Sequence, residues 1–540
     1  MKLATVDYQG QHRVVAELPG GGLLDLAQAA GPDTSVFADM LMMIEGGDAA
    51  LDQARDLIAA ADDAAVLPAD QVSFRAPIMP VQYRDCLVFE EHLFNCLRAF
   101  GQAEPQLPPV WYDQPIYYKG NRLSFIGHGQ DVIWPAYAEH LDIELEMAVV
   151  IGKKGRDIPA DRAEAHIFGY TILNDVSARD AQMREIRHRA QVRGWLYLML
   201  LVLIALVVVG GATRLTDSGL SITEWKPIHG VIPPIGEAQW QEEFAKYKQI
   251  PEYEQVNAGM SLEAFKGIFW WEWGHRLLAR SVGVLFALPL AFFWATGRLD
   301  RRIKWPLLGI LALGGLQGFI GWWMVTSGLT ERVDVSHYRL AVHLMMASLI
   351  YASIMWVARG IAPHAPDLKP TSRSDKIAAL LVVMIFLQMY LGALVAGLDA
   401  GLVFNEWPTM DNGIFPSSQW DPALGLMNYF DTPAIVQFAH RTFAWVVWLA
   451  AAVHMVFAWR WAPGSTHARR AAILFGLVTL QAIFGIVTLL TYVPLEWGLI
   501  HQATAMIVLG FAVAHWRGLV GPLPLEDGTP HRFDMVGVRD

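Results

Sequence analysis

The pattern of apolar and polar residues changes along this chain near Arg187. Before it, charged and turn-forming residues separate short β-branched segments such as MAVVIGKK (147–154) and GYTILNDVS (169–177). Segments of this length and composition are typical of strands in a soluble domain. After Arg187 the chain consists mainly of long apolar runs. We therefore expect a β-rich α+β soluble segment over residues 1–186 and a membrane domain over residues 187–540.

The apolar runs of the second part predict an all-α polytopic membrane protein. A helix needs about 20 apolar residues to cross a bilayer, and about eight runs meet this length. They lie near residues 195–213, 275–296, 305–327, 339–358, 377–397, 441–459, 471–492 and 498–516. The composition agrees, because 54% of the residues are hydrophobic, 21 are Trp and only 17% are charged.

Charge along the chain predicts the side of the membrane on which each loop lies. Basic residues occur in every second loop: Arg184, Arg187, Arg189, Arg193, Arg298, Arg301, Arg302, Lys304, Lys369, Arg373, Lys376, Arg460, Arg469 and Arg470. The loop 398–433, by contrast, contains no Lys or Arg. Because short cytoplasmic loops concentrate these residues, we expect a cell inner membrane protein with both termini in the cytoplasm. The net charge of −11 argues against nucleic acid as a partner and leaves membrane lipid as the expected surroundings.

The membrane part contains an internal repeat. The stretch GGATRLTDSGLSITEW (210–225) matches LGALVAGLDAGLVFNEW (391–407). The matching positions are Asp217, Gly219, Leu220, Glu224 and Trp225 in the first stretch and Asp399, Gly401, Leu402, Glu406 and Trp407 in the second. LQGFIG (316–321) is likewise similar to LQAIFG (480–485). We predict two repeated four-helix bundles, over about residues 195–358 and 377–516, of the kind that places cofactors between facing helices.

Four histidines accompany the repeat, two in each half. His275 in EWGHR and His440 in FAHR each open an apolar helix, and His343 and His501 lie inside later helices. A buried ionisable residue is costly in a membrane unless it ligates, pairs or lines a polar cavity. Haem iron is commonly bound by axial His, so we predict two haem sites near the periplasmic face. The alternative is that each is a helix-end His hydrogen-bonded to a neighbour, which the pairing by repeat disfavours.

Three other histidines have no such counterpart. His454 and His515 lie toward the cytoplasmic ends of their helices, where we expect each to be hydrogen-bonded to a neighbour. His337 is expected in an outer loop, in contact with solvent. The only cysteines, Cys86 and Cys96, lie in the soluble part, so the membrane part contains neither a disulfide nor a thiolate ligand.

One carboxylate distinguishes the two repeats. Glu272 lies three residues before His275, on the same helix face, whereas the corresponding residue before His440 is Gln437. This difference predicts one catalytic site and one electron-transfer site, with a solvated interfacial glutamate as the alternative. Arg276 and Arg441 follow the first histidine of each pair and are candidates for pairing with haem propionates, with snorkelling to the interface as the alternative.

Residues from about 190 to 520 resemble haem A synthase of the proteobacterial and mitochondrial type, through GGATRLTDSGLSITEWKP, NAGMSLEAFKGIFWWEWGHR and GLDAGLVFNEWP. The resemblance implies oxidation of a ring methyl of haem O to the formyl group of haem A, for assembly of cytochrome oxidase. It implies that His440 and His501 ligate a resident haem b and that His275 and His343 hold the substrate haem O. It also implies that Glu272 is the catalytic acid.

This chemistry is compatible with the residues themselves. A methyl group has no acidic proton, so its oxidation needs redox chemistry that haem iron supplies and side chains do not. We expect stepwise oxidation to a gem-diol, which loses water to give the aldehyde. Haem O synthase, cytochrome oxidase assembly proteins and an unidentified electron donor are the expected partners.

Residues 1–186 resemble the N-terminal portion of the fumarylacetoacetate hydrolase family, through YRDCLVFEEH, HLDIELEMAVVIGKKGRDI and GYTILNDVSARDAQ. The resemblance implies Asp85, Glu144, Glu146 and Asp175 as oxygen ligands of Mg²⁺ or Ca²⁺. It implies His92 as the base that activates water. The later segments of that family have no counterpart here, so the segment is expected to be an incomplete, inactive fold joined by a gene fusion or by a fault in the assembled gene sequence.

Two other functions stay open from the sequence. The four histidines also suit a cytochrome-b-like membrane electron carrier, and the N-terminal segment suits a metal-dependent hydrolase anchored by the helices. The presence of Glu272 in only one repeat favours the haem-modifying enzyme over the carrier. The anchored hydrolase requires the missing part of its fold.

Overall fold

The computed structural model describes residues 1–32, 35–99, 107, 110–113, 116–118, 120–136, 138–226, 229–330, 332–362 and 373–523. It divides the chain into two compact units, Met1–Ile186 and Arg187–Asp540. Each unit has a hydrophobic core of its own, so the two are described separately.

The first unit begins with a five-stranded antiparallel sheet in the order β4-β3-β2-β1-β5. Its strands are β1 Leu3–Tyr8, β2 Gln11–Glu17, β3 Leu23–Asp25, β4 Val66–Leu67 and β5 Ser73–Phe74. Three helices, α1 Leu26–Ala30, α2 Met40–Glu45 and α3 Gly47–Ala59, contribute to its core. Asp25 begins α1 by accepting hydrogen bonds from the backbone of Ala27 and Gln28, as an N-cap residue does.

The rest of the first unit is built around a long hairpin of β8 Leu141–Ile151 and β9 Ile167–Ala178. Its smaller elements are β6 Asp85–Cys86, α4 Glu90–Ala99, α5 Val110–Asp113 and β7 Tyr117–Tyr118. One face of β8 exposes apolar side chains, with Leu145 78% exposed and Met147 66% exposed. On β9, Ile172 opposite Met147 is 76% exposed. The segment is therefore β-rich, as expected, but this face of the β8–β9 hairpin exposes its apolar side chains. An uncovered apolar face agrees with an incomplete fold.

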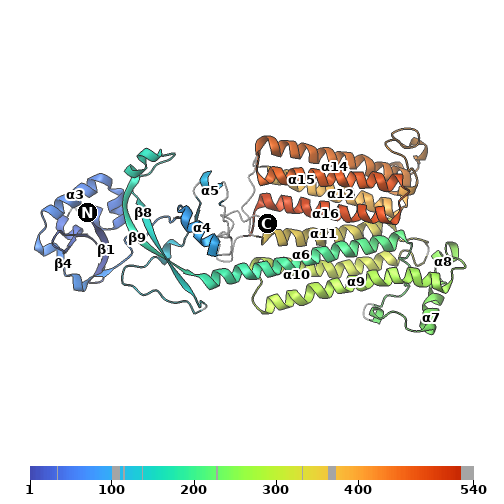
Figure 1. The fold of residues 1–540 in the computed structure, drawn as a ribbon, viewed down its shortest axis with the longest axis horizontal. Helices are drawn as coiled ribbons and strands as arrows, with labels where there is room; N and C mark the ends of the chain where they lie inside the picture. Colours follow the sequence, from blue (N-terminus) through green and yellow to red (C-terminus); the bar gives the residue numbers. More distant parts are fainter. Residues whose placement is uncertain are drawn as a thin grey trace. The chain divides into compact units, whose positions relative to one another are not determined.

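Eight helices of the second unit are long and apolar enough to cross a membrane, as expected from the sequence. They are Arg187–Leu215 (part of α6 Arg179–Leu215), α9 Leu262–Ala295, α10 Arg301–Val325, α11 His337–Gly360, α12 Ser374–Gly397, α14 Pro433–Trp461, α15 Thr466–Leu490 and α16 Leu495–Val520. Figure 1 shows them running side by side, and one apolar core extends through residues of all eight. The short helices α7 Glu237–Tyr247, α8 Pro251–Gln255 and α13 Asn428–Asp431 belong to the connecting loops.

The end of the bundle where the expected cytoplasmic loops meet is tied by polar contacts. Arg189 near the start of the first span forms a buried ion pair with Asp300, which caps α10. The same Arg189 donates from Nη1 to the Leu523 carbonyl at 2.9 Å, and the Leu523 amide donates to the Gly360 carbonyl at 2.6 Å. The chain therefore enters and leaves the bundle at one end. Lys369, one of the basic residues expected here, lies outside the described residues.

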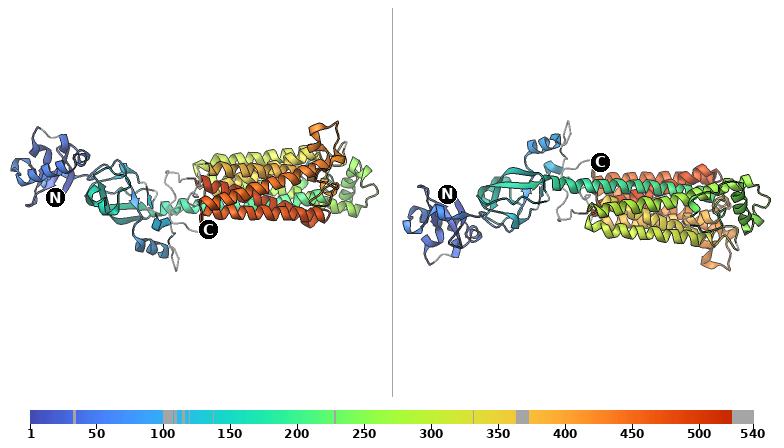
Figure 2. Two further views of the ribbon diagram at one scale, coloured as in Figure 1. Left: turned by 90° about the horizontal axis from the view of Figure 1, so that it is seen from above. Right: turned by 90° about the horizontal axis from the view of Figure 1, so that it is seen from below.

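The opposite end of the bundle has a layer of short helices beyond the apolar core. At about 1.5 Å per residue, the 34 residues of α9 extend roughly 51 Å, well beyond the bilayer's hydrocarbon thickness of about 30 Å. Its first turns pack with α7 through Phe265, Phe269 and Trp240. In both views of Figure 2 these green segments lie at one end of the bundle.

Candidate functional site

The four paired histidines lie on four different helices of the bundle. His275 is on α9, His343 on α11, His440 on α14 and His501 on α16, and each side chain is partly buried. The expectation that EWGHR and FAHR open their helices was wrong. Apolar contacts of the outer layer extend α9 back to Leu262, and Thr432-Pro433 starts α14, so both motifs lie inside helical segments.

Each of these four imidazoles packs against a glycine of a neighbouring helix. A Cβ built on the glycine would lie 2.8 to 3.0 Å from the ring Cε1 in all four cases. The pairs are Gly210 with His275, Gly321 with His343, Gly392 with His440, and Gly485 with His501. Such distances are too short for a methyl group, so only glycine allows the helices and rings to approach this closely. The same contact recurring four times supports the repeat.

Three of the four imidazoles also each contact a glutamine side chain. Gln317, Gln388 and Gln481 each place Nε2 3.0 to 3.2 Å from the ring Nδ1 of His343, His440 and His501, respectively. Each Nε2 also donates to the backbone carbonyl of the same histidine at 3.0 Å. Each Nε2 is an amide donor, whereas a metal-ligating imidazole donates its second ring N–H, so each glutamine positions its histidine through the backbone carbonyl.

His275 differs from the other three. The residue in the place of the glutamine, four before Gly210, is Leu206, which offers only its backbone. Nδ1 of His275 is buried and forms no hydrogen bond to a described side chain. The glutamines were not predicted from the sequence, although LQGFIG (316–321), LQMYLG (387–392) and LQAIFG (480–485) all carry Gln four residues before Gly.

The second pair, His440 and His501, has the geometry that an iron between two imidazoles requires. The ring centroids are 6.5 Å apart and the rings are nearly perpendicular, at 84°. Metal–imidazole bonds of about 2 Å place two axial nitrogens about 4 Å apart, and the ring centres lie about 1 Å farther out on each side. The residues therefore fit a bis-histidine haem. His275 and His343 of the first pair are close enough to interact electrostatically.

Glu272 lies beside the first pair and is held on both carboxylate oxygens. It is only 3% exposed. Its Oε2 accepts hydrogen bonds from Ser221 Oγ and from the Ile222 backbone, both at 2.7 Å. Its Oε1 accepts from Arg276 Nη2 at 2.6 Å. A buried carboxylate fixed by three donors is far from the solvated interfacial glutamate that was the alternative.

Gln437 has the corresponding surroundings in the other repeat, but it donates a hydrogen bond to the loop where Glu272 accepts one. It is 2% exposed, and its Nε2 donates to the Phe404 carbonyl at 3.0 Å. Phe404 is the repeat counterpart of Ile222, so equivalent loops contact both residues. The two backbones are therefore alike, and the acid is what differs.

The two arginines make similar contacts with the loops but differ toward Glu272. Arg276 donates to the carbonyls of Ile222 and Glu224 at 2.9 and 3.2 Å, in addition to Glu272. Arg441 donates from Nη2 to the carbonyls of Pro408 and Thr409 at 3.1 and 3.3 Å. Among the described residues, Nη1 of Arg441 is buried without a hydrogen-bond partner.

The loops that carry these contacts repeat in backbone conformation as well. Asp217 and Asp399, counterparts in the sequence repeat, both adopt left-handed backbone with φ of 47° and 48°. Few non-glycine residues adopt it, and Asp is among them. Arg214 joins the two loops, donating to Asp217 Oδ1 at 2.9 Å and to Asp399 Oδ2 at 2.7 Å.

A second buried carboxyl lies in the outer layer, on α8. Glu252 is 5% exposed, and its Oε2 has no hydrogen-bond partner among the described residues. Burial, together with repulsion from Asp334, Glu272 and Asp217, raises the pKa of Glu252 to about 8. The carboxyl is therefore protonated in the folded protein at neutral pH.

The remaining histidines depart in part from expectation. His337 was expected in solvent, but it begins α11, is 6% exposed and lies 3.2 Å from Asp431 through Nε2, so that expectation was wrong. His454 and His515 contact each other as expected for neighbours, with their Nε2 atoms 2.9 Å apart. His467 joins them, and the sequence analysis gave no reason to place it there.

The first unit brings together three of the four carboxylates expected to bind a cation. Asp85, Glu146 and Asp175 have oxygens within 4.8 Å of one another. Glu144 instead forms an ion pair with Arg179. His92 is exposed on α4, with Nε2 3.6 Å from Cys96 Sγ.

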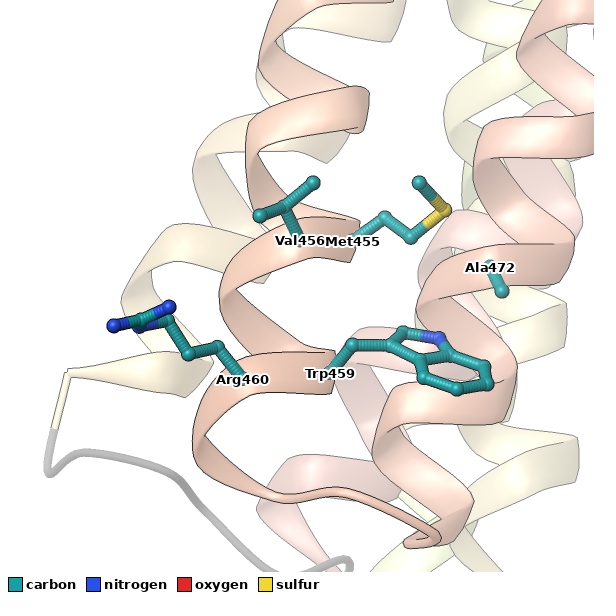
Figure 3. Close-up of a pocket in the computed structure, with 5 residues that line it drawn as sticks. All are labelled: Met455, Val456, Trp459, Arg460 and Ala472. Atoms are coloured by element: carbon teal, nitrogen blue, oxygen red, sulfur yellow. The ribbon is translucent and has the colours of Figure 1, made fainter.

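A hollow of about 460 Å³ lies on the surface of α14 and α15. Its lining residues are Met455, Val456, Trp459, Arg460 and Ala472 (Figure 3). In Figure 3 the indole of Trp459 extends toward Ala472, whereas Arg460 points away from it. An open apolar hollow on two spanning helices is suited to an acyl chain of the bilayer, and it contains none of the paired histidines.

Comparison with known proteins separates the same two parts of the chain. Residues 193–513 match the family described as cytochrome oxidase assembly protein. The sequence is 59% identical to the heme A synthase of Sinorhizobium fredii (strain NBRC 101917 / NGR234) over 353 residues, which cover 65% of this chain and 96% of the relative. It is also 59% identical to the heme A synthase of Rhizobium meliloti (strain 1021) over 349 residues, covering 65% of this chain and 95% of the relative.

Residues 83–196 match the family described as fumarylacetoacetate (FAA) hydrolase C-terminal. A solved fumarylacetoacetate hydrolase from Exiguobacterium antarcticum aligns with 34% of this chain at 24% identity, with a TM-score of 0.25. The chain covers 58% of the length of that protein.

Proposed function

We propose a function that starts from family membership: the chain belongs to the cytochrome oxidase assembly protein family, and its membrane unit is a haem A synthase. It oxidises a ring methyl of haem O to the formyl group of haem A. The single observation that carries the proposal within the site is the buried, triply bonded Glu272 beside one histidine pair, opposite Gln437 beside the other. Two similar haem sites with one acid suit an enzyme with one substrate site.

We assign the second pair, His440 and His501, to a resident haem b, because its spacing fits a bis-histidine iron. Bound there, the haem supplies one-electron transfer. Gln388 and Gln481 hold the two histidines in place by donating to their backbone carbonyls. Arg441 has a buried Nη1 available for a haem propionate.

We assign the first pair, His275 and His343, to the substrate haem O. Gly210 and Gly321 set the positions of the two imidazoles, and Gln317 orients only His343. The lack of such a partner on His275 suits a site that must accept its haem and release it as product. Arg276, assigned by sequence to a propionate, chiefly fixes the Glu272 carboxylate in this structure.

Glu272 is the proposed catalytic residue. One helical turn separates it from His275, so it shares the helix face that presents the substrate ligand. Oxidation of the methyl group withdraws electrons from the reacting carbon, and a fixed carboxylate stabilises the positive charge that develops there. The Ser221 hydroxyl and the Ile222 amide hold the carboxylate before substrate arrives, so little reorganisation is needed.

The proposed enzyme lies in the cell inner membrane with both termini in the cytoplasm and the haem sites toward the periplasm. The basic residues at one end of the bundle support this orientation, as does the shared end at which the chain enters and leaves. Haem O synthase, the source of the substrate, and an unidentified electron donor are the expected partners.

Haem analysis tests this function against an electron carrier. The full chain is produced in cells that make haem O but no haem A, and haems are extracted and separated. The proposal expects haem A with the unmodified chain, and haem O without haem A with Glu272→Ala. A carrier would bind haem b and yield no haem A with either chain.

For the first unit we propose a vestigial Mg²⁺ or Ca²⁺ site without hydrolase activity. Clustering of Asp85, Glu146 and Asp175 supports cation binding by hard oxygen ligands. The exposed apolar face of the β8–β9 hairpin supports the absence of activity, because a substrate site needs that sheet covered. Calorimetric titration of the full chain and of its Asp175→Asn variant with Mg²⁺ tests the site. We expect heat of Mg²⁺ binding from the unmodified chain and none from the variant.

A further inference from the structure

Three histidines converge at the end of the bundle away from the paired histidines. His454 on α14, His467 near the start of α15 and His515 on α16 offer nitrogens that all lie within 4.8 Å of one another. The ring centroids are 5.0 to 5.3 Å apart for each of the three pairs. The side chains are 4%, 1% and 1% exposed, respectively, so three imidazoles share one buried space.

The hydrogen bonds described for these rings do not satisfy all of their buried nitrogens. His454 and His515 contact each other through Nε2 at 2.9 Å. Nδ1 of His515 and Nδ1 of His467 are buried with no hydrogen-bond partner among the described residues. A buried polar atom without a partner is costly, and natural structures retain few of them without a reason.

The cluster is separate from both haem pairs. His440 and His454 lie on the same helix, and the 14 residues between them correspond to roughly 21 Å along its axis. His515 lies near the end of α16, whereas His501 lies near its beginning. The adjoining ends of α14 and α15 carry Arg460, Arg469 and Arg470, so this is the end that we place in the cytoplasm.

We propose that His454, His467 and His515 bind one divalent transition-metal ion of the zinc class at the cytoplasmic end of the second bundle. Imidazole is a preferred ligand of Zn²⁺ and Cu²⁺, and three His with one open position form a common four-coordinate site. Bonds of about 2.0–2.1 Å place ligand nitrogens about 3.4 Å apart, so modest side-chain rotation from the observed distances suffices. The ion ties together α14, α15 and α16.

One neighbouring positive charge, that of Arg470, weakens binding of the ion but does not prevent it. Arg470 lies within electrostatic range of His467 and His515, and its guanidinium repels a cation. The repulsion lowers affinity, whereas three neutral ligands within one coordination sphere provide it. The ion is therefore expected to be held firmly but to be removable by a strong chelator.

Zinc titration of the detergent-purified full chain tests the site. After treatment with a chelator, Zn²⁺ is added in competition with a chromogenic zinc chelator, and zinc content is measured by mass spectrometry. We expect one tightly bound Zn²⁺ per chain, and at least tenfold weaker binding in His467→Gln. The matched control is His337→Gln, which removes a buried histidine at the other end and leaves zinc binding unchanged.

Equal zinc affinity in the unmodified chain and in His467→Gln would overturn the proposal, as would the absence of tight binding in both. Zinc held instead by His275 and His343 would appear as binding that persists in His467→Gln. If that variant fails to fold, X-ray absorption at the zinc edge of the unmodified chain decides. Three imidazole ligands support the site, and a shell without three imidazoles contradicts it.

Discussion

The two histidine pairs of the membrane unit are built from the same parts, and they differ in what lies beside them. Both pairs pack against glycines on neighbouring helices, and both have an equivalent loop over one end. Only the first has a carboxylate, Glu272, where the second has Gln437. Duplication thus preserved the glycine contacts and the loop. Glu272 in place of Gln437, together with Leu206 in place of a glutamine beside His275, separates the proposed reaction site from the proposed electron site.

Loss of a ligand from either pair is expected to have the largest effect and to separate the pairs. His440→Ala removes a proposed ligand of the proposed resident haem, so haem b content of the purified chain should fall to background. His343→Ala should leave haem b in place and abolish haem A formation. Absorption spectra of the reduced protein and extracted-haem analysis measure the two effects. Equal loss of haem b in both variants would show that the pairs are not distinct.

Substitution of the acid tests the comparison at one position. Glu272→Gln makes the first site like the second, and haem A formation should fall about 100-fold, as when one preorganised electrostatic group is lost. Haem b content should stay constant. The matched control is Gln437→Glu, for which Arg441 stands four residues away as Arg276 does for Glu272. It should leave haem A formation within about twofold, and a large loss there would contradict the assignment of roles.

Substitution of the glycines that contact the histidines is expected to have intermediate effects, and these effects again differ between the two repeats. Gly485→Ala puts a methyl group 2.9 Å from Cε1 of His501, and the displacement costs about 1–3 kcal/mol, or about 5- to 150-fold in haem b affinity. Gly321→Ala should lower haem A formation by a similar factor and spare haem b. Gly476→Ala on α15 is the control, because nothing lies within 4 Å of its added Cβ. Haem titration monitored by absorbance measures each.

The smallest expected effect is on thermal stability. It concerns Glu252, a residue of the outer layer that only the first repeat has. Its folded pKa, about 8, exceeds the ordinary value of 4.5, so the folded state binds one more proton than the unfolded state between these values. Its contribution to stability is therefore lost as pH rises from about 4.5 to 8. Glu252→Gln should raise the thermal midpoint at pH 8 by a few degrees and leave it unchanged at pH 4.5. A midpoint difference independent of pH would contradict the protonated carboxyl.

Membrane spans and the repeat were predictable because each depends on local composition. Eight apolar runs gave eight spanning helices. The start of α9 was predicted too late. The helix begins at Leu262 after Ser261, a favoured N-cap residue whose Oγ accepts from the Ala264 amide, and its first turns pack against α7. His337 was misplaced for a related reason, since its burial depends on Asp431 far along the chain.

Within the site, the ligand candidates could be identified from sequence but their neighbours could not. Histidines and one glutamate in an apolar setting are conspicuous, whereas Gln317, Gln388 and Gln481 look like ordinary polar residues of a helix. Their role requires knowing which helix lies beside which. The same holds for His467, which becomes notable only when the ends of α15 and α16 meet.

The most direct test of the central claim is extracted-haem analysis in a host that makes haem O and lacks its own means of making haem A. Side by side, the unmodified chain, Glu272→Gln and Gln437→Glu are produced at equal levels. We expect haem A with the unmodified chain and with Gln437→Glu, and almost none with Glu272→Gln. Equal haem A from all three, or loss with Gln437→Glu alone, would contradict the claim that one carboxylate separates the two haem sites.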